Sequence, residues 1–338
     1  MVILSITIIF ALNSCSYNKK QLSFNSEKEI NLILIPYPDI LGISMQIMKD
    51  SNLLFINDFR GDTLIHVFDI QKQKIIKKII PVGNGPNELI SPLEIHFSNN
   101  ELFIFCRQTS TAYIISKKLL LAGSKNMEKL FQVSHLSNHL YPLNDSLFLS
   151  SGLYEKRYSL INNHGGTIYE FGEYPTYWYE EKNIPIEARA MFHQVDFEKN
   201  PSAQMFVTFS SHILEIYDYH TNIYQPILVK SILMGNYNYK YTTGSVLSVR
   251  NGYDVERGIK SVAVSSKYIF IVYSERKDDS QNADSQIRII DWEGNPIKIL
   301  KSNKEINCLV IDENEQKGYC IISDPDDSLA YFDLYEII

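Results

Sequence analysis

Residues 186–195 carry the acid, guanidinium and imidazole groups whose types and spacing best suit chemistry. If this segment, IEARAMFHQV, is a strand, Glu187, Arg189 and His193 project from the same side, because side chains alternate along a strand. Such a set could bind an anionic ligand or supply a general base, a role for which imidazole is suited. The alternative is that the three groups only line a hydrated channel or form an ion-pair network. We take Glu187, Arg189 and His193 as candidate ligand-binding residues.

Aromatic residues offer a second candidate surface. Trp178 and Tyr179 lie in a tyrosine-rich stretch over residues 174–179, and a second tyrosine cluster covers residues 237–241. Aromatic rings at a loop rim could stack on a saccharide or a peptide. The alternative is that they pack large loops together.

The chain lacks the short motifs of common enzymes. The sequence contains no G-x-S-x-G elbow, no H-E-x-x-H helix and no pair of C-x-x-C motifs. The acidic stretches 312–316 and 324–327 are typical of solvated turns rather than of a calcium loop, which needs a glycine at its sixth position. We therefore expect no metal, no cofactor and no catalytic residue.

The N-terminus predicts export and lipid attachment. Residues 1–14 form an apolar stretch of signal-peptide length, too short to span a bilayer as a helix, and they end directly before Cys15. The sequence around Cys15, LNSC, resembles a lipobox, in which the cysteine thiol is acylated after cleavage. Residues 15–27 would then be the lipidated cysteine and its polar tether. The alternative is an apolar strand or helix with a chance cysteine.

Three further cysteines are too few for a disulfide-built scaffold. Cys308 and Cys320 would face each other if residues 305–323 form a hairpin. Both a cross-strand disulfide and two buried free thiols fit this arrangement.

The charge of the chain argues against nucleic acid as a partner. The formal net charge is −7, and no run of Lys or Arg is longer than two residues. Binding to a phosphate backbone requires a basic surface.

A repeat of apolar strands and polar turns predicts the fold. Short runs rich in Ile, Leu, Val, Phe and Tyr recur between turn residues, and helical periodicity is scarce. Six copies can be aligned, with starts 45 to 63 residues apart, at residues 53–79, 101–123, 146–171, 205–229, 268–300 and 317–338. This spacing is close to the length of a four-stranded propeller blade with its loops.

The flanking segments complete the predicted blades. Short apolar segments that precede the copies suit innermost strands, at residues 43–48, 93–97, 188–195, 259–264 and 305–311. The apolar segment 29–36 could add the fourth strand of the last blade and so remove two exposed sheet edges. We predict an all-β fold over residues 28–338, a six-bladed β-propeller closed by an N-terminal strand. The alternatives are a β-sandwich, two smaller β domains, or a propeller of five or seven blades.

A glycine-rich turn lies between the first two copies. In the sequence VGNGPNEL, Gly83 and Gly85 permit backbone conformations that other residues avoid, and Pro86 favours the turn. Glu88 could cap exposed N–H groups nearby. No helix pattern follows to make this a phosphate site, so we expect a structural turn.

The turn and a second short motif carry a resemblance. Residues 82–89, with their G-x-G-P-x-E pattern, and residues 171–175, FGEYP, resemble the TolB-like six-bladed β-propeller lipoproteins. The resemblance covers residues 25–338 and implies a six-bladed fold and a lipid anchor. It implies no particular reaction, because one fold hosts binders, scaffolds and enzymes.

Together these features predict a cell-envelope lipoprotein whose propeller is a binding or scaffold module rather than an enzyme. Its expected partners are the membrane, through the lipid, and an envelope protein, a peptide or a saccharide. The alternative is a hydrolase or lyase that works in the central funnel with Arg189 and His193.

The anchor can be tested directly. Changing Cys15 to Ala should release the protein from the membrane fraction, because residues 16–338 contain no apolar stretch long enough to span a bilayer. Fractionation followed by immunoblotting measures this release. A Cys15→Ala protein that still sediments with membranes after a salt wash would contradict lipid anchoring.

Overall fold

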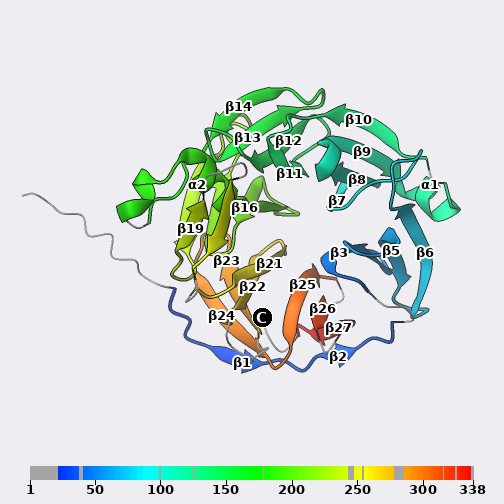
Figure 1. Cartoon of the computed structure of the whole chain (residues 1–338). Helices are drawn as coiled ribbons and strands as arrows, with labels where there is room; N and C mark the ends of the chain where they lie inside the picture. Colours follow the sequence, from blue (N-terminus) through cyan, green and yellow to red (C-terminus); the bar gives the residue numbers. More distant parts are fainter. Residues whose placement is uncertain are drawn as a thin grey trace, which may run out of the picture.

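Six sheets stand around a central axis as the blades of a propeller (Figure 1). The computed structural model describes residues 22–37, 41–98, 100–124, 126–177, 179–242, 247–252, 255–277, 285–314, 316–323 and 326–335. The blades follow one another around the ring in chain order. The predicted all-β, six-bladed fold is confirmed.

The first three blades are antiparallel four-stranded sheets. Blade 1 contains β3 (Ser44–Asp50), β4 (Leu53–Asp58), β5 (Thr63–Asp69) and β6 (Lys74–Pro81). Blade 2 contains β7 (Leu93–Ser98), β8 (Glu101–Cys106), β9 (Thr111–Ser116) and β10 (Glu128–Gln132), with η1 (Arg107–Thr109) and α1 (Lys117–Ala122) between strands. Blade 3 contains β11 (Ser137–Pro142), β12 (Leu147–Gly152), β13 (Tyr158–Asn162) and β14 (Thr167–Phe171).

The other three blades follow the same plan, with additions. Blade 4 contains β15 (Asp196–Lys199), β16 (Met205–Phe209), β17 (Ile213–Asp218) and β18 (Ile227–Leu233). Blade 5 contains β21 (Gly258–Val264), β22 (Tyr268–Ser274), β23 (Ser285–Asp291), β24 (Pro296–Ser302) and β1 (Glu27–Glu29). Blade 6 contains β25 (Glu305–Asp312), β26 (Lys317–Ser323), β27 (Asp327–Asp333) and β2 (Ile33–Leu34).

The predicted repeats correspond to real blades. Each copy begins at or next to the second strand of a blade, the strand that is buried on both faces, as in β12, where all residues are buried. A strand packed against blades on both sides needs apolar side chains on both faces, so it appears in the sequence as a continuous apolar run. The outermost strands are more exposed to solvent, and β18 is exposed over its first five residues.

The N-terminal segment closes the ring, but in two pieces. β2 pairs antiparallel with β27, and the backbone N–H of Ile35 donates to the carbonyl oxygen of Leu329 at 2.8 Å. β1 pairs parallel with β24 and adds a fifth strand to blade 5. The buried residues of the segment are Ile30, in the core between blades 5 and 6, and Ile35, in the core between blades 6 and 1. The predicted closure by an N-terminal strand is confirmed.

The prediction that residues 188–195 form an innermost strand is wrong. This stretch belongs to α2 (Ile186–Phe192) and the turn after it, and the innermost strand of blade 4 is β15. Glu, Ala, Arg and Met all favour a helix, and Pro185 at the N-cap leads into it. Ala188 and Ala190 are both buried although residues two apart lie on nearly opposite sides of a helix, so α2 is covered on more than one side.

Two insertions pack together beside blade 4. The first contains η2 (Tyr179–Asn183) and α2, and the second is the hairpin of β19 (Tyr239–Thr242) and β20 (Ser248–Asn251). They share an apolar core that includes Ala188 and Tyr239. No helix within the described ranges is long and apolar enough to cross a bilayer.

Two neighbouring residues test ring closure. Ile35 is 8% exposed whereas Leu34 is 60% exposed. Ile35→Ala should lower the free energy of unfolding by about 2–3 kcal/mol, because it leaves a cavity between blades 6 and 1. Leu34→Ala is the matched control and should change it by less than about 0.5 kcal/mol. Urea unfolding of both variants measures the difference, and equal effects would contradict closure through Ile35.

Candidate functional site

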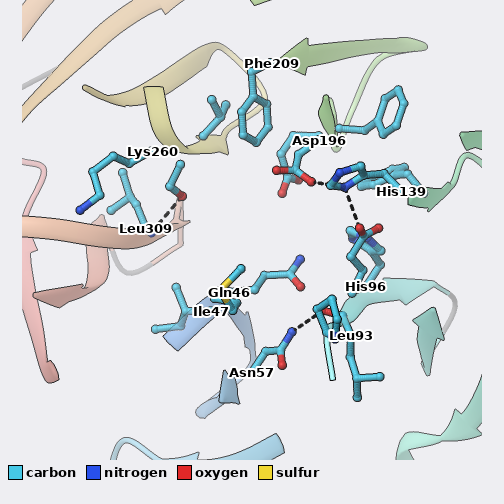
Figure 2. A pocket seen from close by; sticks show the side chains of 18 of the residues that line it. Gln46, Ile47, Asn57, Leu93, His96, His139, Asp196, Phe209, Lys260 and Leu309 are labelled. Atoms are coloured by element: carbon cyan, nitrogen blue, oxygen red, sulfur yellow. Dashed lines mark hydrogen bonds and ion pairs between the residues drawn. The ribbon is translucent and has the colours of Figure 1, made fainter. Parts of the chain in front are cut away.

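A cavity on the propeller axis is the best candidate for a site. It has a volume of about 140 Å3, and all six innermost strands contribute to its wall (Figure 2). The wall is apolar on the side of blade 6, where Leu309 lies, and strongly polar on the side of blades 2 to 4.

Three successive blades each place two polar residues on the cavity wall. The pairs are Glu94 and His96 on β7, His139 and Tyr141 on β11, and Asp196 and Glu198 on β15. Residues two apart project from the same side of a strand. Each of these innermost strands therefore directs one face with polar side chains toward the axis. The residues between them, such as Ile95 and Leu140, are fully buried in the blade cores.

Glu94, His139 and Asp196 meet at one point, and we call them the channel triad. The Nδ1 atom of His139 lies 2.7 Å from Oε1 of Glu94 and 2.6 Å from Oδ1 of Asp196. The side chains of His139 and Glu94 are 13% and 18% exposed, and that of Asp196 is 54% exposed. The second oxygen of Glu94 accepts the backbone N–H of Leu140 at 3.0 Å, which fixes the carboxylate.

The two carboxylates control the charge of His139. Burial lowers the pKa of this imidazole, but Glu94 and Asp196 raise it more strongly, to about 10. Burial likewise opposes ionisation of Asp196, and the nearby His139 outweighs it, so the pKa of Asp196 is lowered. Both shifts favour a protonated His139 imidazole beside an ionised Asp196.

Burial shifts the pKa values of other members of the three pairs. Burial lowers the pKa of His96 to about 4, against the effect of nearby carboxylates, so this imidazole is neutral at pH 7. Burial raises the pKa of Glu198 to about 8, and Asp196 adds to the shift. The ring of His96 meets that of Tyr141 edge-on at 4.5 Å.

The lysine and the arginine of the cavity wall, Lys260 and Arg107, each have a hydrogen-bond partner. Lys260 donates to Oε1 of Glu305 at 2.7 Å and to Oδ1 of Asn307 at 2.6 Å. Arg107 donates from Nη2 to the side-chain oxygen of Gln194 at 2.8 Å. Glu94 and Asp196 offer carboxylate oxygens on the polar side of the cavity, and these accept hydrogen bonds from a hydroxyl or an ammonium group.

Comparisons with known proteins agree with this architecture. A family model described as TolB-like 6-blade propeller-like matches residues 23–314. The chain belongs to the TolB-like propeller family. No curated protein matches the sequence.

Two solved structures share the fold. One is a member of the duf4221 family from Bacteroides vulgatus, with a TM-score of 0.54 and 11% identity over 90% of this chain and 97% of that one. The other is a candidate exported protein from Bacteroides fragilis, with a TM-score of 0.55 and 12% identity over 91% of this chain and 98% of that one. At this identity the likeness concerns the fold of the TolB-like propeller alone.

The structure places Glu187, Arg189 and His193 away from the cavity of this TolB-like propeller. Glu187 is exposed on α2, Arg189 is half-buried, and His193, directly after the helix, is buried. None of the three lines the cavity. The predicted channel wall was therefore taken from the wrong segment, because a helix replaces the expected strand.

His193 belongs to a network around Glu181, a carboxylate with no exposed surface. Nε2 of His193 lies 2.7 Å from Oε1 of Glu181, and the backbone N–H of Tyr177 donates to Oε2 at 2.9 Å. The hydroxyls of Tyr237 and Tyr239 donate to the same carboxylate at 3.1 to 3.2 Å. Burial lowers the pKa of His193 to about 4, so its imidazole is neutral at pH 7.

The tyrosine clusters mainly pack the insertions. Tyr174, Tyr237 and Tyr239 are buried, and the hydroxyl of Tyr174 lies within 3.0 to 3.2 Å of three backbone carbonyl oxygens. Trp178 and the side chain of Tyr179 lie outside the described residues, so their proposed role in stacking stays a prediction.

The glycine-rich turn folds around its own glutamate. Oε2 of Glu88 accepts the backbone N–H of Gly85 at 2.8 Å, and a side chain on Gly83 would collide with the same carboxylate. The turn that contains Pro86 joins blades 1 and 2, where Val82 bridges to Leu89. Its geometry accords with the structural role expected for it.

The two cysteines of the last blade are free thiols. Cys308 pairs in register with Ile321, and Cys320 with Leu309, so the two cysteines are one position out of register across the hairpin. Both are buried and free, and burial raises the pKa of each to about 12. Of the two arrangements expected from the sequence, the structure has the free thiols.

The buried network makes a stability prediction. His193→Ala should lower the free energy of unfolding by about 2–4 kcal/mol, because it removes a donor from the buried Glu181 carboxylate. Glu187→Ala, at an exposed position of α2, is the control and should change it by less than about 0.5 kcal/mol. Denaturant unfolding at pH 7 measures both. An unperturbed His193→Ala protein would argue against a structural role and would return His193 to the list of ligand-binding candidates.

Proposed function

We propose that this protein is a cell-envelope lipoprotein, held to the membrane through Cys15, whose propeller binds a ligand in its axial cavity. The N-terminal sequence supports the anchor, since an apolar stretch of signal-peptide length precedes Cys15. The fold of this chain resembles that of a candidate exported protein from Bacteroides fragilis, which is consistent with export. Membership of the TolB-like family agrees with an envelope location.

The observation that carries the binding proposal is the convergence of six polar side chains on one cavity. They come from three blades, and the strands that hold them are fixed by cores on both sides. Polar groups that are placed precisely in a concave, partly apolar site are the usual mark of a ligand pocket. Chain folding alone does not require carboxylates and imidazoles at the axis.

The chemistry of the cavity wall limits the classes of ligand that could bind. Carboxylates accept hydrogen bonds from hydroxyl and ammonium groups. A saccharide hydroxyl or a basic peptide side chain fits this wall, and the volume of about 140 Å3 admits such a small group rather than a folded domain. A partner protein would therefore be recognised through one inserted side chain.

A hydrolase or lyase is the second candidate, favoured by the contact of the His139 imidazole with two carboxylates. His139 and Asp196 would then replace Arg189 and His193 as the candidate catalytic residues. Conversion of a bound compound during incubation separates this candidate from a binding module.

Filling the cavity tests the proposal. Met45 lines the cavity and is 54% exposed, so Met45→Trp should occlude the site with little cost in folding. The melting temperature is measured with a panel of small saccharides and basic peptides. A compound that raises the melting temperature of the wild-type protein should leave Met45→Trp unchanged.

Leu119→Trp provides the matched control. Leu119 is 52% exposed on α1, away from the cavity wall, and its variant should respond to ligands as the wild-type protein does. A response that persists in Met45→Trp, or a panel in which no compound acts, would refute binding of this ligand class in the cavity.

A further inference from the structure

The contacts of His139 are unusual for an ion pair. One ring nitrogen, Nδ1, lies within 2.7 Å of two carboxylate oxygens, from Glu94 and Asp196. This nitrogen is buried, and neither contact has the direction of a hydrogen bond. A single N–H can be directed at only one acceptor. Three donor atoms from three strands therefore converge on one point of the cavity wall.

Convergence on a centre is the geometry of metal ligands. One donor atom each from Glu94, His139 and Asp196 lies within 4.8 Å of the other two. Imidazole nitrogen together with carboxylate oxygen is a donor set of Zn2+ and Mn2+ sites. Two carboxylates also balance the charge of a divalent cation.

The surroundings of the triad suit a metal site as well. The three residues lie on β7, β11 and β15, three separate strands whose positions are set by blade cores. The backbone N–H of Leu140 donates to the second oxygen of Glu94, and carboxylates that bind a metal are commonly held by such a hydrogen bond. The half-exposed Asp196 leaves the centre open to the cavity.

We propose that the channel triad binds one divalent transition-metal ion, Zn2+ or Mn2+. Three protein ligands leave at least one coordination position open on the cavity side, as in metal sites that engage a further molecule. This inference rests on the proposed function, because the ion would lie in the same cavity and would supply a Lewis-acidic contact for an oxygen of the ligand.

Metal titration tests the inference on the full exported chain. The protein is treated with a chelator, dialysed, and titrated calorimetrically with Zn2+ and with Mn2+ in the absence of any organic ligand. One ion per chain should bind. Asp196→Asn and Glu94→Gln keep the shape of each side chain and remove its charge, and each should weaken binding about 100-fold.

A second acid–imidazole pair gives the control. Asp218 lies 2.5 Å from His220 on the surface of blade 4, outside the cavity. Asp218→Asn should bind the ion as the wild-type protein does. Thermal melts without metal check that all variants fold, and anomalous scattering from crystals grown with Zn2+ should place the ion between Glu94, His139 and Asp196.

Two results would overturn the inference. One is the absence of stoichiometric Zn2+ or Mn2+ binding by the wild-type protein, which would leave the triad as a protonated imidazole between two carboxylates. The other is wild-type affinity in both Asp196→Asn and Glu94→Gln. Either result leaves the saccharide and peptide panel unaffected, so a failure of the metal site is distinguishable from a failure of ligand binding.

Discussion

The packing of each blade against two neighbours is the constraint on which the rest of the structure depends. The middle strands are apolar on both faces, and the clusters of buried side chains lie between blades rather than within one blade. A propeller that stayed open would expose two such faces to water. Burial of apolar surface is the dominant favourable contribution to folding, so closure is essential. Ile30 and Ile35 connect the N-terminal segment to the two cores beside blade 6.

The closed ring also explains how the triad forms. Glu94, His139 and Asp196 are far apart in the sequence, but they occupy comparable positions in successive blades. Each lies seven to nine residues before the starts of the repeats at residues 101, 146 and 205. Rotation from one blade to the next brings comparable positions of neighbouring innermost strands together at the axis. A contact of 2.6 to 2.7 Å between three blades is therefore a property of the ring, not of any one segment.

The fold was predictable because its signal is repeated and strong. Each blade contains a doubly buried strand, and six such apolar runs at blade-length spacing leave few other architectures. The candidate site was not found from the sequence. The motifs E-x-H, H-x-Y and D-x-E are each too short to stand out, and their meaning depends on which strands are innermost. Residues 186–195 drew attention instead, because their alternation resembles a strand, although glutamate, alanine, arginine and methionine together favour a helix.

The buried Glu181 carboxylate and the channel triad differ in how their polar atoms are satisfied. Glu181 accepts hydrogen bonds from one imidazole, two tyrosine hydroxyls and one backbone N–H, so its carboxylate has partners on both oxygens. The donors to this carboxylate all lie in the two insertions, so the network ties the insertions to each other. In the channel triad two carboxylates share one imidazole nitrogen, and the direction of a hydrogen bond is met with neither. A buried polar atom without a hydrogen bond costs free energy on folding. The triad also borders a cavity, whereas Glu181 has no exposed surface, so binding is expected at the axis.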